Sequence, residues 1–337
     1  MDSLTQAVLG GAVTYAVLGR HLGKRATLCG MVLGTLPDLD VLIDFGGPIE
    51  NMTHHRGFSH SFLVQALVTP LFSRLLSRLP FGRDASLIRW HIAVYLCFTT
   101  HSLADLFTVY GTQILWPLTD YPFAHSILFI VDPVYTIPLL VAVICSFLIH
   151  ERDRALTLNV IMLGLSTLYL VWSTGAKWVI DHRIQKALAK RGISVQIFES
   201  TPAPLNTLLW RGVAVKDDQY FEIWASIFDN LDQIQVRGFP QNKELLTTII
   251  DHPKIERLTW FTKGQYKVRQ SDDKIIISDL RMGVEGAYVF NFEVGRQINN
   301  QINIGSFQQI QQRFDVGGLY SVWDRIFDPT VRVSKPD

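Results

Sequence analysis

Histidines and aspartates gather in four short segments of the N-terminal half of the chain. The segments are PDLD (37–40), HHRGFSHS (54–61), HSLADLFTVYG (101–111) and AHSILFIVDP (124–133). Imidazole and carboxylate groups are the usual protein ligands of zinc and of neighbouring divalent metals. A bound ion lowers the pKa of its water toward neutrality, and the resulting hydroxide can attack an ester or a phosphoester. The four segments therefore indicate a metal centre with hydrolytic chemistry, and zinc is the expected metal.

The predicted metal ligands come from the second and third segments. His101 and Asp105 lie four residues apart, so on a helix their side chains point the same way. An ionisable group inside an apolar run costs on the order of 3 kcal/mol unless it is paired, and a metal ion is the simplest partner for Asp105. The histidines of the second segment complete the predicted ligand set, and they are His54, His55 and His60.

Three other side chains are candidates for a catalytic role. Asp38 and Asp40 follow a proline that ends helical regularity, and they could bridge two ions, orient ligand histidines or act as a general base. Arg56 has the planar fork that grips a phosphate or a carboxylate through two parallel hydrogen bonds. Alternatively, Arg56 lies at the membrane boundary and pairs with lipid headgroups or a carboxylate. Groups expected just outside the ligand set are Thr108, His125 and Asp132.

Apolar runs surround these segments and predict helices embedded in a membrane. A helix that crosses a bilayer needs about 20 apolar residues, and the runs 127–149 and 156–180 meet that length. Four further runs are shorter or carry polar residues, and they are 4–18, 27–43, 61–76 and 92–107. We expect about six embedded helices, of which the second and third are tilted or re-entrant.

Lysines and arginines set the expected orientation of these helices. They concentrate at 20–25, 74–89 and 152–154, whereas the loop 46–59 has one arginine and the loop 109–126 has no lysine or arginine. Cytoplasmic loops carry the excess of positive charge. The four histidine and aspartate segments would therefore meet on the side that faces away from the cytoplasm, and the C-terminal half would lie there too.

The composition changes after about residue 182, which suggests a second domain. We expect a mainly α-helical, membrane-embedded metal-site domain over residues 1–182 and a soluble α+β accessory domain over residues 183–337. Alternating apolar residues typical of strands occur at 193–199, 220–228, 274–280 and 287–295. This half contains no P-loop, no GxSxG and no cysteine, so we assign it no catalytic group.

Overall charge and cysteine content exclude two other classes of protein. The net charge of +1 is too small for a protein whose main partner is nucleic acid. The three cysteines all lie in apolar runs, which excludes a zinc finger and argues against a disulfide framework.

The motifs resemble the YdjM-like family of inner-membrane, metal-dependent hydrolases. GTLPDLD (34–40), HHRGFSHS and HSLADLFTVYGTQILWPL (101–118) correspond to the family's PDxD, its HRGxTHS-type loop and its HxxxDxxTxxG segment that ends near Leu-x-Pro. Ser59 stands where the family commonly has threonine. The resemblance covers roughly residues 1–140, and it implies a multi-pass protein of the bacterial inner membrane with hydrolase activity.

Two functions stay open on these observations. The first is a metal-dependent hydrolase that acts on a lipid or lipid-linked (phospho)ester at the periplasmic face of the inner membrane, with the bilayer and that lipid as its partners. The alternative is a non-enzymatic membrane protein. In that case the metal or hydrogen-bond network holds broken helices together, or intramembrane aspartates and histidines pass ions or protons.

Overall fold

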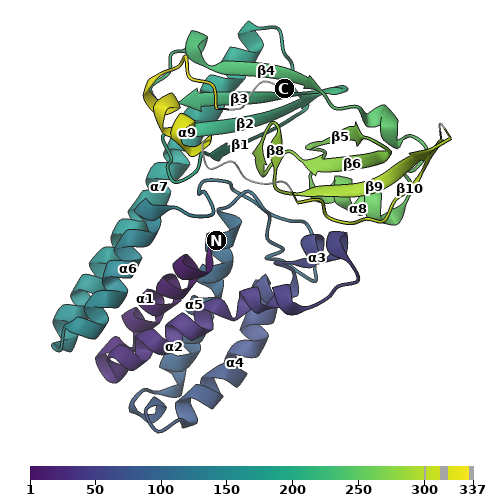
Figure 1. The fold of residues 1–337 in the computed structure, drawn as a ribbon. Coiled ribbons are helices and arrows are strands. Elements are labelled where there is room, and N and C mark those ends of the chain that lie inside the picture. The colour runs from purple at the N-terminus through teal and green to yellow at the C-terminus, as the bar shows by residue number, and fades with distance from the viewer. Residues whose placement is uncertain (300, 312–317, 334–337) are drawn as a thin grey trace. The chain divides into compact units, whose positions relative to one another are not determined.

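The chain forms two compact units, one helical and one built around β-sheets (Figure 1). The computed structural model describes residues 1–299, 301–311 and 318–333. The helical unit comprises Met1–Ile43 and His55–Thr174, and the sheet unit comprises Asp44–His54 and Gly175–Asp337. A helical N-terminal part followed by a part with both sheets and helices is the order that the sequence predicts.

The helical unit contains six helices within the described residues. They are α1 (Ser3–Leu22), α2 (Lys24–Thr35), α4 (Phe62–Arg78), α5 (Leu87–Leu106), α6 (Pro133–Leu148) and α7 (Arg152–Lys190), the last of which continues into the sheet unit. Short 3-10 helices lie at η1 (Pro37–Leu42), η2 (Phe58–His60) and η3 (Gly82–Asp84). The polar segments singled out above fall at the ends of these helices and in the turns between them.

Glycines allow α1 and α2 to approach closely. A Cβ atom added at Gly10 would lie 2.3 Å from the carbonyl oxygen of Gly30, and one at Gly34 would lie 2.6 Å from the carbonyl oxygen of Gln6. A side chain at either position would collide with the neighbouring backbone, so only glycine allows the two helices to come this close. Small residues have the same role at the interfaces of membrane helices. Helix α5 packs against α1 and α2, which brings the residues after Gly34 close to the C-terminal turns of α5.

The number of membrane-spanning helices is smaller than expected. Among the described residues α7 is long and apolar enough to cross a bilayer, and α6 is apolar but has only 16 residues. Helix α2 has 12 residues, about 18 Å of helix against about 30 Å of hydrocarbon. Helix α5 carries Arg89, His101 and Asp105. The prediction of about six spans is therefore wrong for this structure, because several apolar runs are too short or too polar.

In the part of the sheet unit that the structure describes, there are two four-stranded antiparallel sheets and a small hairpin. The first sheet has the order β1 (Ile197–Pro202), β2 (Leu209–Lys216), β3 (Gln219–Ser226) and β4 (Gln235–Pro240). The second has the order β10 (Gln301–Ile304), β9 (Asn291–Ile298), β6 (Lys274–Asp279) and β5 (Tyr266–Ser271). The hairpin pairs β7 (Gly283–Val284) with β8 (Ala287–Tyr288).

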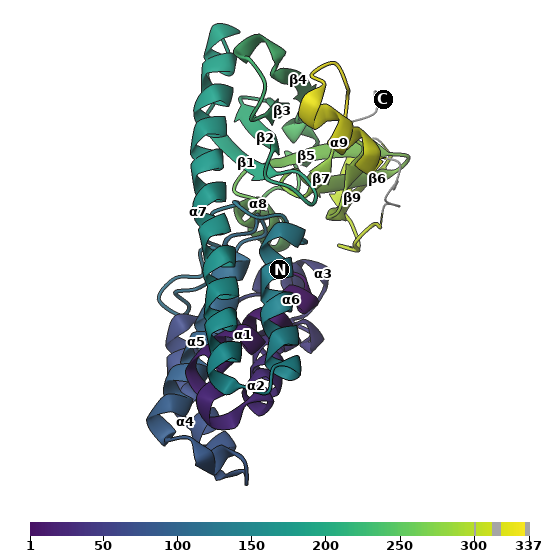
Figure 2. The same cartoon turned by 90° about the vertical axis from the view of Figure 1, so that its left-hand side faces the viewer.

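Among the described residues of this unit, three α-helices accompany the sheets, and the C-terminal part of α7 joins them. They are α3 (Pro48–His54), α8 (Pro253–Phe261) and α9 (Gly318–Phe327), and α9 packs against β2 and β3 (Figure 2). Ile180 and Ile184 of α7 pack with Trp210 and Ile223 of the first sheet. The apolar side of that sheet is therefore covered by α7, the same helix that is long and apolar enough to span a bilayer.

A buried ionic group connects the first sheet with the hairpin and β5. Arg211 Nε donates to Glu222 Oε1 at 2.8 Å, and the same oxygen accepts from the backbone N–H of Glu285 at 3.1 Å. Glu285 in turn accepts hydrogen bonds from Lys267 and from the hydroxyl group of Tyr288. Two cations and two carboxylates thus neutralise one another where burial would otherwise make single charges costly.

Candidate metal centre

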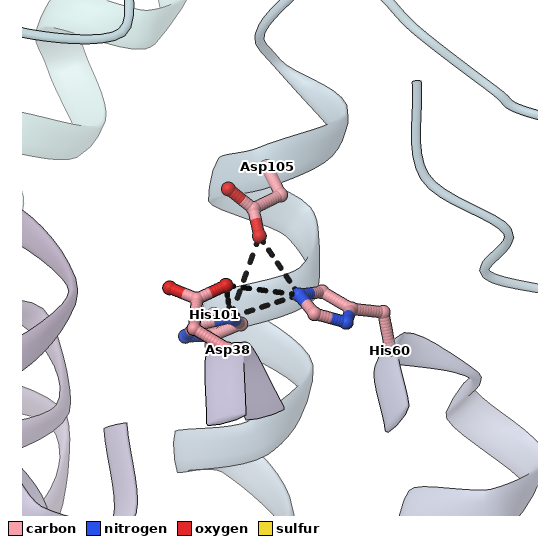
Figure 3. A group of neighbouring side chains, drawn as sticks. All are labelled: Asp38, His60, His101 and Asp105. Atoms are coloured by element: carbon pink, nitrogen blue, oxygen red, sulfur yellow. Dashed lines mark hydrogen bonds and ion pairs between the residues drawn. The ribbon is translucent and has the colours of Figure 1, made fainter. Parts of the chain in front are cut away.

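Four side chains of the helical unit converge on one point (Figure 3). They are Asp38, His60, His101 and Asp105, and one ligand atom from each lies within 4.8 Å of the others. Asp105 Oδ2 is 3.0 Å from His60 Nε2 and 3.3 Å from His101 Nε2. Asp38 Oδ1 is 3.4 Å from each of the same two nitrogens. Two imidazoles and two carboxylates form a donor set suited to a divalent metal.

Three local structures place these side chains. Helix α5 carries His101 and Asp105 one turn apart on one face. Pro37 stands at the start of η1, which follows α2 directly and carries Asp38. His60 ends η2, just before Ser61 caps the start of α4 by accepting from the backbone N–H of Val64. Each ligand therefore lies at a helix terminus or within the last turns of a helix.

The carbonyl group of Gly34 orients the ring of His101. The last four carbonyl groups of a helix have no partner within it, and Gly34 lies in the last turn of α2. Its oxygen is 2.7 Å from His101 Nδ1, so Nδ1 carries the hydrogen that is donated. In the neutral imidazole Nε2 then has a free lone pair that points at the other three ligand atoms.

Asp40 and Ser59 orient the ring of His60 in the same way. The Ser59 hydroxyl group has one hydrogen, which it donates to Asp40 Oδ2 at 2.7 Å. The hydroxyl oxygen, 2.9 Å from His60 Nδ1, must therefore accept from that nitrogen. His60 Nε2 is left with a lone pair, as in metal sites where a carboxylate orients a ligand histidine from outside the coordination shell.

Hydrogen bonds keep Asp40 ionised and hence an acceptor. Burial alone would raise the pKa of the Asp40 carboxyl, but the hydrogen bond with His55, the proximity of His55 and His60 and the hydrogen bond from Ser59 lower it further than burial raises it. The net effect is a pKa below the ordinary value for aspartate. His55 Nδ1 is 2.7 Å from Asp40 Oδ1, so His55 acts through Asp40 in this arrangement.

The converging atoms are all acceptors, so the site fits a cation. Asp38 Oδ1 is buried and has no hydrogen-bond partner among the described residues. The Nε2 atoms of His60 and His101 lie 3.1 Å apart with their lone pairs facing. Without a positive charge among them, two carboxylate oxygens and two lone pairs repel one another. Asp38 is the one partly exposed member of the group, which leaves one edge open to solvent.

Arg56 is buried beside the group and holds the second oxygen of Asp105. Its Nη2 lies 3.1 Å from Asp105 Oδ1, and its Nη1 donates to Thr108 Oγ1 at 3.0 Å. The guanidinium also lies over the ring of Tyr110, 4.9 Å from its centroid. Asp105 Oδ1 accepts a further hydrogen bond from the amino group of Met1. With Oδ1 held in this way, Oδ2 is directed at the two histidines.

The other predicted site residues lie outside the four-residue group. His54 belongs to the sheet unit, where its ring stacks on Phe45 with centroids 5.3 Å apart. Asp132 caps α6 by accepting from the backbone N–H of Val134 at 3.0 Å and accepts from the Tyr169 hydroxyl at 3.0 Å. His125 is exposed.

Two groups that orient the ligand histidines were not predicted from the sequence. The hydroxyl group of Ser59 orients His60, and the position of Ser59 next to a ligand histidine is a usable signal in the sequence. Gly34 acts through its backbone carbonyl, and a backbone atom leaves no residue-type signal in a sequence.

Helix α7, which is long and apolar enough to cross a bilayer, and a largely buried group of histidines and aspartates that could hold a metal ion are the features expected of a membrane protein with a metal-binding group. Residues 1–178 match the family model described as YdjM inner membrane protein. The chain belongs to this family, which confirms the resemblance seen in the motifs. A search of the curated proteins gave no match, and neither did a search of the solved structures.

Proposed function

We propose that this protein is a metal-dependent hydrolase that acts on a lipid or lipid-linked ester or phosphoester at the periplasmic face of the inner membrane. The observation that carries the proposal is the convergence of two histidine lone pairs and two carboxylate oxygens within 4.8 Å. A bound zinc ion would supply a hydroxide at neutral pH and polarise the ester oxygen.

The residues of this chain take distinct roles in the proposal. His60, His101 and Asp105 are buried and hold the ion, while Asp38 completes the set at the edge that solvent reaches. A catalytic zinc site keeps one position for water or substrate, and the partly exposed Asp38 marks where that position would open. Asp38 is also the candidate general base, because its second oxygen is not part of the four-atom group.

Apolar side chains beside the centre support an amphiphilic substrate. On η1 the neighbours of the two aspartates are exposed, namely Leu39, Val41 and Leu42. Phe58 and Trp116 are exposed as well, and their rings meet edge to face with centroids 6.4 Å apart. An apolar surface next to a polar centre suits a molecule with a hydrocarbon part and a polar head, and aromatic rings are common at the membrane interface.

Metal analysis of the purified protein tests the metal site, and a panel of lipid esters and phosphodiesters then tests the activity. We expect about one zinc ion per chain and hydrolysis that stops when a chelator removes the metal. Well-folded protein with no metal above background would overturn the proposal at its base.

A structural metal site is the second candidate function, and the presence of four protein ligands favours it. Structural zinc sites are closed by four protein ligands, whereas catalytic sites keep an open position. Cobalt(II) in place of zinc separates the two cases, because its visible absorption reports coordination. Added inorganic phosphate should change the spectrum of a centre with an open position and leave that of a closed site unchanged.

The periplasmic location is also part of the proposal, and the distribution of positive charge supports it. Asp120 is exposed in the loop 109–126, which has no lysine or arginine. An Asp120→Cys variant, made in a background without Cys29, Cys97 and Cys145, should react with an impermeant thiol reagent in spheroplasts. Reaction only after the cytoplasmic side is opened would reverse the orientation.

A further inference from the structure

The segment Asp44–His54 lies in the chain between two parts of the candidate metal centre. Asp40 precedes the segment closely, and His55 and Arg56 follow it directly. The segment nevertheless belongs to the sheet unit, where its helix α3 packs against α8 (Figure 1). The connection between two motifs of the centre is thus shaped by a helix that comes about 200 residues later in the chain.

Two polar pairs join α3 to α8. Glu50 Oε1 lies 2.9 Å from Lys254 Nζ, and Thr53 Oγ1 accepts from Arg257 Nε at 2.6 Å. Each helix contributes residues three apart, which lie on one face. The two pairs therefore hold the helices together at positions one turn apart, which fixes the rotation of α3 as well as its position.

Helix α3 depends on this contact for its own structure. It has seven residues, and isolated helices shorter than about 12 residues are marginal in water. The side chains of Glu50 and Lys254 are only 20% and 32% exposed, so their attraction is screened less than that of a fully exposed pair. Loss of the contact would allow the whole connection to take other conformations.

The end of α3 leads directly into groups that act on the centre. Arg56 lies two residues after the end of α3. Its φ angle of 61° lies in the left-handed region, which residues other than glycine adopt only when the surrounding structure holds them there. Its backbone N–H donates to Asp40 Oδ2 at 3.0 Å, and its guanidinium holds Asp105. A shift of the preceding helix would therefore reach Asp40, which orients His60, and Asp105, which belongs to the ligand group.

We infer that Lys254 and Arg257 of α8 are positioning residues for the metal centre, which they affect through α3. This inference rests on the metal centre of the proposed function and gives the sheet unit a task, namely to hold the connection between the PDLD and HHRGFSHS motifs in the conformation that binds metal. A merely structural contact would stabilise the sheet unit without any effect on the centre.

Charge reversal in the full-length protein tests the inference. We compare Glu50→Lys, Lys254→Glu and the double exchange with Lys190→Glu, which reverses the charge of an exposed ion pair with Asp232 elsewhere in the sheet unit. Binding of cobalt(II) to the metal-free protein is followed by its visible absorption, and hydrogen exchange of residues 48–54 reports whether α3 stays folded. These readouts do not require the substrate.

Each single reversal should weaken cobalt(II) affinity about tenfold and change the absorption spectrum, as loss of an orienting group outside the coordination shell does. The double exchange should restore both, and Lys190→Glu should leave both as in the wild type. Rapid exchange in residues 48–54 together with unchanged affinity and spectrum would overturn the inference and leave the metal centre intact. Failure of the wild type to bind cobalt(II) would instead overturn the proposed function, and the inference with it.

Discussion

The Nε2 atoms of His60 and His101 lie 3.1 Å apart, and in the neutral form of both rings neither nitrogen carries a hydrogen. His101 donates its Nδ1 hydrogen to the carbonyl group of Gly34, and His60 donates its own to Ser59. Two facing lone pairs repel one another at this distance, so a cation, either a metal ion or a proton, must lie between them. The arrangement of the two rings therefore predicts that the four side chains bind a cation.

Loss of either histidine should remove the metal. We expect His101→Ala to lower zinc affinity by more than about a hundredfold, since loss of an outer orienting group alone costs 10- to 100-fold. Metal content of the purified variant measures the effect. His91→Ala is the matched control, because His91 is half-buried on the same helix, away from the ligand group, and its Nδ1 bonds the carbonyl group of Leu87. Equal metal content in the two variants would argue against His101 as a ligand.

The hydroxyl group of Ser59 should matter for metal affinity. Ser59→Ala removes the acceptor that fixes the hydrogen of His60 on Nδ1, so we expect roughly 10- to 100-fold weaker binding. Ser59→Thr keeps the hydroxyl group and should bind nearly as well as the wild type. Competition with a chromophoric chelator measures both variants. Similar affinity of the alanine and threonine variants would contradict the role of the hydroxyl group.

The variant Arg56→Lys tests whether Arg56 positions Asp105 or binds the substrate. Arg56→Lys retains the charge but not the fork that reaches Asp105 and Thr108 together. If Arg56 holds Asp105 in place, metal affinity should fall about tenfold. If it serves only to grip an anionic substrate, metal affinity stays unchanged and turnover alone falls. Chelator competition and a kinetic assay on the same preparation distinguish the two roles.

Gly34 couples helix packing to the centre. In Gly34→Ala the new Cβ would lie 2.6 Å from the carbonyl oxygen of Gln6, so α1 and α2 must separate at a cost of about 1–3 kcal/mol. The same movement displaces the carbonyl group that orients His101. Thermal unfolding in detergent and metal affinity should both decline. Gly164→Ala has open space around its Cβ and should change neither.

A fall in pH should lower the stability of the sheet unit, because the buried carboxylate of Glu285 becomes protonated. Burial would raise the pKa of the Glu285 carboxyl, but hydrogen bonds from Lys267 and Tyr220 lower it more, so the pKa lies below its ordinary value. A group with a depressed pKa in the folded state adds stability above its unfolded pKa of about 4.3 and loses it as the pH falls through the folded value.

Comparison of wild type with Glu285→Gln tests this dependence. Urea unfolding of the solubilised protein should show a smaller loss of stability in the variant as the pH falls from neutral to well below about pH 4. The variant is already weaker at neutral pH by about 1–3 kcal/mol. Glu244→Gln changes an exposed glutamate in the same unit and should behave like the wild type. A wild-type pH dependence in Glu285→Gln would assign the effect to other groups.

The succession of a helical part and a part with sheets could be predicted from the sequence, and so could the central residues of the candidate site. A helical spacing put His101 and Asp105 on one face, because positions i and i+4 always share a face. The motif order was enough to recognise the family over roughly residues 1–140, and the family match extends to residues 1–178. The number of helices long enough to span a bilayer was not accessible in this way, because the length of an apolar run does not show how many of its residues form one helix. The run 27–43, for example, contains α2 only as far as Thr35.

Only the tertiary structure decided which of several equivalent residues face the centre. Asp38 and Asp40 are two residues apart on a 3-10 helix, where three residues make a turn, so they point in different directions. One joins the ligand group and the other orients a ligand. His54 and His60 belong to different units because α3 packs on α8. Residue type and spacing name the candidates for a metal site, but contacts between segments distant in the chain choose among them.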